Sequence, residues 1–155
     1  AKMVRVGTAC EMKTAVDEAF PSADIAIFSA AVSDFRPRTV SDRKLKKGAD
    51  DEALAHIELV ENPDILASCG TAKHAGQVVV GFAAETNDVV GNARSKLSRK
   101  KADFIVANDV SSGRGFGADS DEVAFVSASG EEHLPEMDKR ELADRILDKA
   151  LEFLK

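Results

Sequence analysis

The chain has little cysteine and no long apolar run, and each absence excludes a class of protein. Its two cysteines, Cys10 and Cys69, are too few for a disulfide framework. No stretch is long and apolar enough to span a bilayer, so we expect no membrane partner. No signal peptide is visible, which favours a reducing, cytoplasmic location.

Several catalytic and metal-binding motifs are missing as well. The three histidines are scattered and neither cysteine has a ligand neighbour at a useful spacing, which argues against a zinc site. No P-loop and no Gly-x-Ser-x-Gly elbow is present. Gly113, Gly115 and Gly117 lack the G-x-G-x-x-G spacing and its strand-to-helix context, so we interpret them as a mobile loop. A Rossmann-type dehydrogenase is therefore disfavoured.

The composition fits one ordinary globular domain over residues 1–155. The chain is 44% hydrophobic and 31% charged, and its length allows a real core. Its net charge of -6 argues against general nucleic-acid binding, because affinity for a phosphate backbone requires basic charge. Localised basic patches are still allowed.

Alternation of strands and helices predicts an α/β fold. We expect a three-layer, mainly parallel, Rossmann-like sheet with helices on both faces and a β-ribbon or hairpin extension. We predict four strands, at 24–32, 54–60, 77–84 and 103–107, and a hairpin that turns at 129–130. We expect the strand at 24–32 to be buried on both faces and the strand at 54–60 to be half-exposed. The predicted helices begin near Thr8, near Asn62-Pro63-Asp64, at a cap within Glu85-Thr86-Asn87, and at Asp138.

Two basic clusters stand out in this acidic chain. Six basic residues lie between Arg36 and Lys47, just after Asp34 at the end of a strand, and five more lie between Arg94 and Lys101. Lys96 and Lys100 are four apart and share a helix face. Ligands collect at the carboxyl ends of parallel strands, so the two clusters together favour a polyphosphate site. A solvated loop and compensation of a helix dipole are the alternatives.

Five short motifs, in this order, carry a resemblance to a known family. They are Ala30-Ala31-Val32-Ser33-Asp34-Phe35, Lys44-Leu45-Lys46-Lys47, Asn62-Pro63-Asp64-Ile65, Gly81-Phe82-Ala83-Ala84-Glu85-Thr86 and Ala107-Asn108-Asp109-Val110. With these motifs the chain resembles phosphopantothenate-cysteine ligase, the C-terminal synthetase domain of the bacterial bifunctional coenzyme A biosynthesis protein. The resemblance covers nearly the whole chain.

The resemblance implies a reaction and a site. The family joins 4'-phosphopantothenate to L-cysteine through an acyl-cytidylate, consumes CTP, releases pyrophosphate and CMP, and uses Mg²⁺. Lys44, on a flexible loop, matches a family residue with a catalytic role, and the metal ligands are left unassigned. The residues implied to bind CTP are Phe28, Ser29, Ala30, Asp34, Lys44, Pro63, Asp64, Ile65, Leu66, Phe82, Lys96 and Lys100.

The resemblance also sets expectations about what surrounds this chain. Family members begin with a strand, a glycine-rich turn and an asparagine that contacts the phosphopantothenoyl group, and this chain starts after them. We therefore expect a truncated fragment with weak CTP binding and uncertain ligase activity. A homodimer, formed in part by the run at 54–60, and a fused decarboxylase domain are further expectations. The alternative function is a non-catalytic nucleotide-binding fragment or regulatory domain.

Overall fold

The centre of the protein is a five-stranded sheet with the order β1-β4-β5-β7-β8, seen in a computed structural model that describes residues 1–111 and 120–154. The strands β1 (Ile25–Phe28), β4 (Val78–Glu85) and β5 (Phe104–Asp109) run parallel. The hairpin of β7 (Val123–Ser127) and β8 (Gly130–His133) adds two antiparallel pairings. The predicted α/β sheet and its late hairpin are confirmed.

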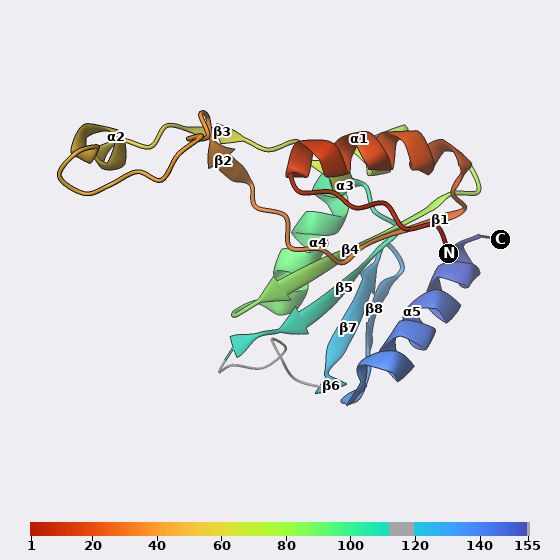
Figure 1. Cartoon of the computed structure of the whole chain (residues 1–155). Coiled ribbons are helices and arrows are strands. Elements are labelled where there is room, and N and C mark those ends of the chain that lie inside the picture. The colour runs from red at the N-terminus through yellow and green to blue at the C-terminus, as the bar shows by residue number, and fades with distance from the viewer. Residues whose placement is uncertain (112–119, 155) are drawn as a thin grey trace.

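Helices cover both faces of this sheet (Figure 1). On one face, α5 (Lys139–Phe153) packs Leu142, Ile146 and Ala150 against side chains of β4, β5 and β7. On the other face lie α1 (Ala9–Ala19), α3 (Ile65–Ala72) and α4 (Val89–Lys100). Side chains alternate between faces along β4, so Val78 and Val80 belong to the α5 side, and Val79 and Ala83 to the other. The three-layer prediction is confirmed.

Side-chain caps fix where the helices begin. Thr8 and Glu11 form the predicted capping box of α1, with the Glu11 amide donating to Thr8 Oγ1 at 3.1 Å. Asp138 caps α5 as predicted, accepting from two backbone amides. Asp64 caps α3, accepting from the Ala67 amide at 3.0 Å. The cap predicted for α4 within residues 85–87 is wrong by one position, because Asp88 adopts a left-handed conformation and caps the helix itself.

An antiparallel ribbon extends away from the sheet; we call residues 35–61 the arm (Figure 1). Its base is β2 (Phe35–Pro37) paired with β3 (Leu59–Glu61), and its outer part carries a short helix, α2 (Asp51–Ala55). The strand predicted over 54–60 is wrong except at its end, because residues 54–55 belong to α2, residues 56–58 are in neither helix nor strand, and β3 begins at Leu59. The sequence Asp-Glu-Ala-Leu-Ala places two acids in the first turn and good helix formers after them, which favours a helix over a weak alternation.

Two further expectations differ from the structure or lie beyond it. The strand predicted over 24–32 forms only at Ile25–Phe28, and residues 29–32 are a loop. β1 is the edge of the sheet and Ile27 is 39% exposed, so this strand is not buried on both faces. The short strands β6 (Ser120–Asp121) and β9 (Met137–Asp138) pair beyond the glycine-containing loop. Most of that loop, including Gly113, Gly115 and Gly117, lies outside the described residues. Within the described part of the chain, each helix is too short or too polar to cross a membrane.

Candidate functional site

A cavity of about 150 Å³ lies at the carboxyl ends of the parallel strands, where β1 and β4 meet the base of the arm and the start of α3. This is the edge of an open α/β sheet at which ligands usually bind. The lining residues are Met12, Phe28, Ala30, Val32, Ser33, Asp34, Asn62, Pro63, Asp64, Ile65, Leu66, Phe82, Lys96 and Lys100. The cavity is smaller than the roughly 300–1,000 Å³ common for drug-sized ligands, so a whole nucleotide would extend beyond it.

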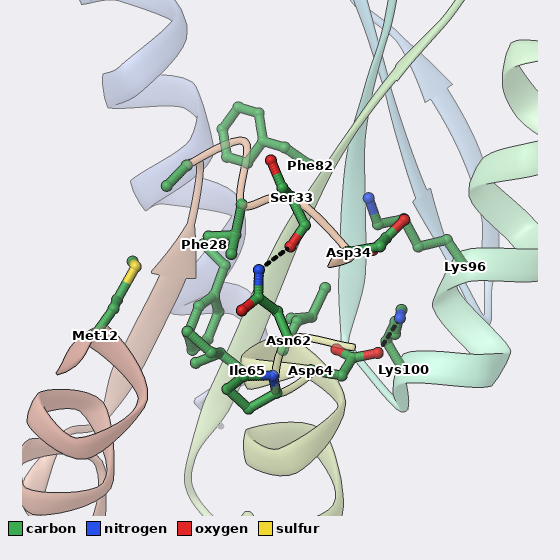
Figure 2. Close-up of a pocket in the computed structure, with 14 residues that line it drawn as sticks. Met12, Phe28, Ser33, Asp34, Asn62, Asp64, Ile65, Phe82, Lys96 and Lys100 are labelled. Carbon is green, nitrogen blue, oxygen red and sulfur yellow. Dashed lines mark hydrogen bonds and ion pairs between the residues drawn. The ribbon is translucent and has the colours of Figure 1, made fainter. Parts of the chain in front are cut away.

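The cavity has two chemically different sides (Figure 2). Met12, Phe28 and Ile65 lie together on an apolar side, and Asp34, Asp64, Lys96 and Lys100 lie on a charged side. An aromatic or sugar ring fits the first side, and an anionic group fits the second. The arrangement therefore suits an amphipathic anion better than a purely apolar or purely ionic ligand.

On the charged side, Lys100 at the end of α4 forms an ion pair with Asp64, the cap of α3. Partial burial alone would raise the pKa of Asp64. Hydrogen bonds from Lys100 and the Ala67 amide outweigh this, together with the positive charges of Lys100 and Arg99, and lower that pKa. Asp64 is therefore a carboxylate at neutral pH, and it neutralises one of the two lysines.

Lys96 lies one turn earlier on α4 and faces the same cavity. Partial burial lowers the pKa of Lys96, and the nearby positive charges of Lys100 and Arg99 lower it further. Glu85 and Asp34 act in the opposite direction, but they do not restore it. The positive charge of Lys96 is thus poorly compensated by the protein. An anionic ligand would supply the missing compensation.

Two glycines allow the elements around the cavity to approach closely. A Cβ on Gly70 of α3 would lie 1.9 Å from the backbone oxygen of Lys100, so only glycine lets α3 contact the last turn of α4. A Cβ on Gly81 of β4 would lie 2.7 Å from Leu66 and 2.8 Å from Ile105. Gly81 thus leaves room for Leu66, which lines the cavity. Both contacts fix the position of residues at the site.

The structure brings together most of the residues predicted to bind CTP. All of them line the cavity except Ser29 and Lys44. Ser29 follows β1 directly, and Lys44 is an exposed residue of the arm. Their roles toward CTP stay predictions, because no ligand is bound.

Other basic residues of the first cluster have partners on the arm itself. Arg38 pairs with Glu58 at 2.8 Å, and Arg43 pairs with Asp50, outside the cavity in both cases. Arg36 donates to the backbone oxygen of Glu61 at 2.6 Å. For these three arginines, the contacts fit a solvated loop better than a ligand site.

Sequence reasoning missed four residues that line the cavity, Met12, Val32, Ser33 and Asn62. The sequence presents Asn62 as a possible helix cap and as part of a family motif, but Asp64 caps α3, and the Asn62 side chain donates to the loop after β1. Its place in that motif, directly before Pro63, is the signal that was available. Met12 could not have been found, because its contact depends on how α1 packs.

A second hollow, of about 710 Å³, lies between α4, β5 and β7. Its lining is rich in acids, namely Asp109, Asp121, Glu122 and Glu136. A polyphosphate would be repelled there, so size alone does not identify the site. Among the described residues, no three His, Cys, Asp or Glu side chains come together as a metal site.

Comparisons with known proteins identify the family of this chain. Residues 1–154 match the family model described as the DNA/pantothenate metabolism flavoprotein C-terminal domain. Two curated relatives are each called coenzyme A biosynthesis bifunctional protein CoaBC. The Mycolicibacterium smegmatis relative is 40% identical over 99% of this chain and 39% of its own length. The Vibrio cholerae relative is 43% identical over 93% of this chain and 36% of its own length.

A solved structure gives the same result for the fold. The crystal structure of the C-terminal domain of a coenzyme A biosynthesis bifunctional protein CoaBC aligns with a TM-score of 0.73 and 34% identity. The alignment covers 94% of this chain and 62% of that one. The chain thus spans well under half the length of the two curated relatives.

Proposed function

Because the chain belongs to the family of DNA/pantothenate metabolism flavoprotein C-terminal domains, we propose that it is a CTP-dependent phosphopantothenate-cysteine ligase domain of coenzyme A biosynthesis. One observation carries this proposal: a cavity with an apolar side and a two-lysine side at the carboxyl edge of the parallel strands. The names of the curated relatives support the pathway.

We infer that the nucleotide spans the two sides of the cavity. The base and ribose would lie near Phe28, Ala30 and Asp34, and the triphosphate near Lys96 and Lys100. Phosphate binding favours the charged form of Lys96, whose pKa the protein lowers. Lys100 would exchange its contact with Asp64 for a phosphate oxygen. Pro63, Ile65, Leu66 and Phe82 would shape the remaining surface, and Ser29 would contact the nucleotide from the edge of β1.

The proposed reaction has two steps. A carboxylate oxygen of 4'-phosphopantothenate attacks the α-phosphorus of CTP, and pyrophosphate leaves with the electron pair of the broken P–O bond. The amine of L-cysteine then attacks the acyl carbon, loses a proton, and displaces CMP to form the amide. Lysines that neutralise the leaving phosphates lower both barriers.

Lys44 is proposed to act mainly on the acyl-cytidylate. It lies exposed on the arm, outside the cavity, so it would reach the reacting groups only if the arm moved toward the site. Such closure would also keep water from the reactive mixed anhydride.

Mg²⁺ is proposed as the metal partner of CTP. The described carboxylates of the cavity are Asp34 and Asp64, and Asp64 is already paired with Lys100. The residues fit a metal held chiefly by phosphate oxygens, with Asp34 as the available protein oxygen donor, which is the usual way Mg²⁺ is bound with nucleotides. When bound, Mg²⁺ would neutralise charge on the phosphates.

Further partners follow from the family. We propose a cytoplasmic homodimer in which the arm contributes to the interface, and a decarboxylase domain in the same polypeptide, since the relatives are called bifunctional. The exposed side chains of Phe35, Ile57 and Leu59 on the arm support the dimer. Light scattering tests it: a monomer at micromolar concentration would contradict a dimer formed by this chain.

The decisive assay is release of pyrophosphate from CTP. The proposal expects release that requires 4'-phosphopantothenate and that falls when both Lys96 and Lys100 are replaced by Met. The alternative, a non-catalytic nucleotide-binding domain, is favoured by the exposed position of Lys44 away from the cavity. It predicts CTP binding by calorimetry without pyrophosphate release. Absence of both CTP binding and pyrophosphate release would contradict both functions.

A further inference from the structure

The loop after β1 makes few hydrogen bonds of its own, although it supplies Ser33 and Asp34 to the cavity. Residues 29–34 are all exposed and belong to no helix or strand. Within this loop, the one backbone hydrogen bond is from the Val32 amide to the Ala30 oxygen, at 3.1 Å. Such a loop does not hold a side chain in one place without external contacts.

Those contacts come from one residue, Asn62. Its backbone amide donates to the Asp34 oxygen at 2.7 Å, and its Nδ2 donates to the Ser33 oxygen at 2.8 Å (Figure 2). Two consecutive carbonyls of the loop are therefore held by a single residue on the neighbouring strand end at the base of the arm. Asn62 directly follows β3, whose pairing with β2 is regular, so its own position is well defined.

Arg36 fixes which way the Asn62 amide faces. Its Nη1 donates to Asn62 Oδ1 at 3.1 Å and to the Glu61 backbone oxygen at 2.6 Å. A rotation of the amide by half a turn would place its NH₂ group against the guanidinium and its oxygen against the Ser33 carbonyl. Both contacts would become repulsive, so the network selects one orientation. Arg36 is half-buried, whereas Arg38 is exposed and pairs with exposed Glu58.

We propose that Asn62, oriented by Arg36, is a positioning residue that sets where Asp34 stands in the cavity. Both polar atoms of its side chain already have protein partners, so it acts through the loop and not through the ligand. This inference rests on the proposed function, since the ligand used to detect it is CTP. Arg36 supports the site by orienting Asn62, although Arg36 itself does not line the cavity.

The test compares variants of this chain by calorimetry with CTP and by thermal unfolding. Asn62→Ala should weaken CTP binding about 10-fold, because the Nδ2 bond that holds the Ser33 carbonyl and the Arg36 bond that orients it are lost, and the remaining backbone bond to Asp34 is loosened. Arg36→Lys should weaken it by a smaller factor, about 3-fold, because a lysine keeps the charge but not the rigid planar group that directs Nη1 toward both oxygens. Arg38→Ala is the matched control and should leave CTP affinity unchanged.

A double-mutant cycle separates positioning from a general structural effect. If Asn62 acts through Asp34, then in an Asp34→Ala background the further change Asn62→Ala should weaken binding less than about 2-fold. An equal loss in both backgrounds would overturn the proposal. So would wild-type affinity in both Asn62→Ala and Arg36→Lys. If Asn62→Ala does not fold, Arg36→Lys in the two backgrounds decides.

A second measurement does not depend on the ligand. Amide hydrogen exchange at residue 62 and at Val32, whose amides donate to the Asp34 and Ala30 oxygens, should be faster in Asn62→Ala and Arg36→Lys than in wild type, with unchanged exchange in β4 and β5. Unchanged exchange at both amides would also overturn the proposal. A wild-type chain that does not bind CTP would instead contradict the proposed function, and the exchange result would still decide the role of Asn62.

Discussion

The two regions that would act on a nucleotide are built in opposite ways. The lysine side of the cavity belongs to α3 and α4, where Gly70 contacts the backbone of Lys100 and Ala93 is fully buried against the sheet. Lys44 is an exposed residue of the arm. The outer part of the arm is held by an ion pair between Arg43 and Asp50 and not by a hydrophobic core. The lysine side is thus fixed by packing, whereas the outer arm is held by contacts within its own chain. If the domain acts on CTP as proposed, binding would belong to the first region and movement to the second.

The largest expected effect tests the arm. Lys44→Gln should lower the rate of ligation by about 10²–10³-fold, because one charged group that stabilises the transition state is removed. The melting temperature should stay the same, since Lys44 is exposed. The measurement is pyrophosphate release together with turnover of a preformed acyl-cytidylate, and Lys47→Gln is the control.

Loss of CTP affinity in Lys44→Gln with normal turnover of the acyl-cytidylate would contradict this role. It would place Lys44 with the binding lysines and remove the functional contrast between the two regions.

Gly70→Ala tests the packed lysine side. Alanine is normally the better helix former by about 1 kcal/mol, so helix propensity predicts stabilisation. The 1.9 Å approach to the Lys100 oxygen predicts the opposite. We expect a net loss of about 2–3 kcal/mol in the free energy of unfolding, measured in urea.

The matched control is Thr71→Ala, an exposed neighbour in the same helix, which should be neutral or stabilising. A stable Gly70→Ala protein would mean that α3 and α4 can separate without cost, and the lysine side would then be no more rigid than the arm.

Lys96→Met should separate binding from stability. The pKa of Lys96 is lower in the folded state than in the unfolded state, so the charged side chain destabilises the folded state at any pH where a free lysine is protonated. This destabilisation is lost as the pH rises above both pKa values. Methionine keeps the apolar stem. We expect CTP affinity to fall about 10-fold and the melting temperature to rise by ~1–3 °C. A fall in both would show that Lys96 also stabilises the fold.

Asp64 gives a pH-dependent test. Its pKa is lowered in the folded state, so its ion pair stabilises the protein above the unfolded value, near 3.9, and this contribution is lost as the pH falls through the lower folded value. Asp64→Asn retains a good helix cap. At neutral pH the variant should melt about 1–2 °C lower than wild type, and the difference should vanish once the pH has fallen below the lowered pKa of the folded state. A difference that persisted there would have to come from the cap.

The smallest effect belongs to the outer arm. Asp50 accepts from Arg43 and from the Lys46 amide, and these bonds lower its pKa. Asp50→Ala should change the melting temperature by less than about 1 °C, because its partner Arg43 is exposed and solvent weakens the pair. Tryptic cleavage at residues 43–47 should nevertheless become faster. Unchanged cleavage would show that the arm is ordered by something other than this pair.

Sequence patterns were sufficient for the elements that are decided locally or by burial. The capping residues of α1 and α5 and the apolar run of β4 each specify their element, and the structure agrees. The strand expected at 54–60 failed because its alternation is short and competes with strong helix formers at 51–55.

The site was only partly within reach of the sequence. The lysines of α4 could be placed on one face by spacing, and the resemblance supplied most of the other cavity residues. Asn62 and Met12 depend on how the arm and α1 meet the sheet, which no local pattern encodes. The edge position of β1 likewise depends on the order of strands, and its apolar residues do not reveal that order.

The ion pair between Lys100 and Asp64 has a consequence for product release. If CTP is the ligand, Lys100 is never without an anion: it is held by Asp64 before the phosphates arrive and can return to Asp64 as pyrophosphate departs. The carboxylate then acts as an internal competitor, which lowers affinity for substrate and product alike. Such a site binds CTP and pyrophosphate less tightly, and it releases the product faster.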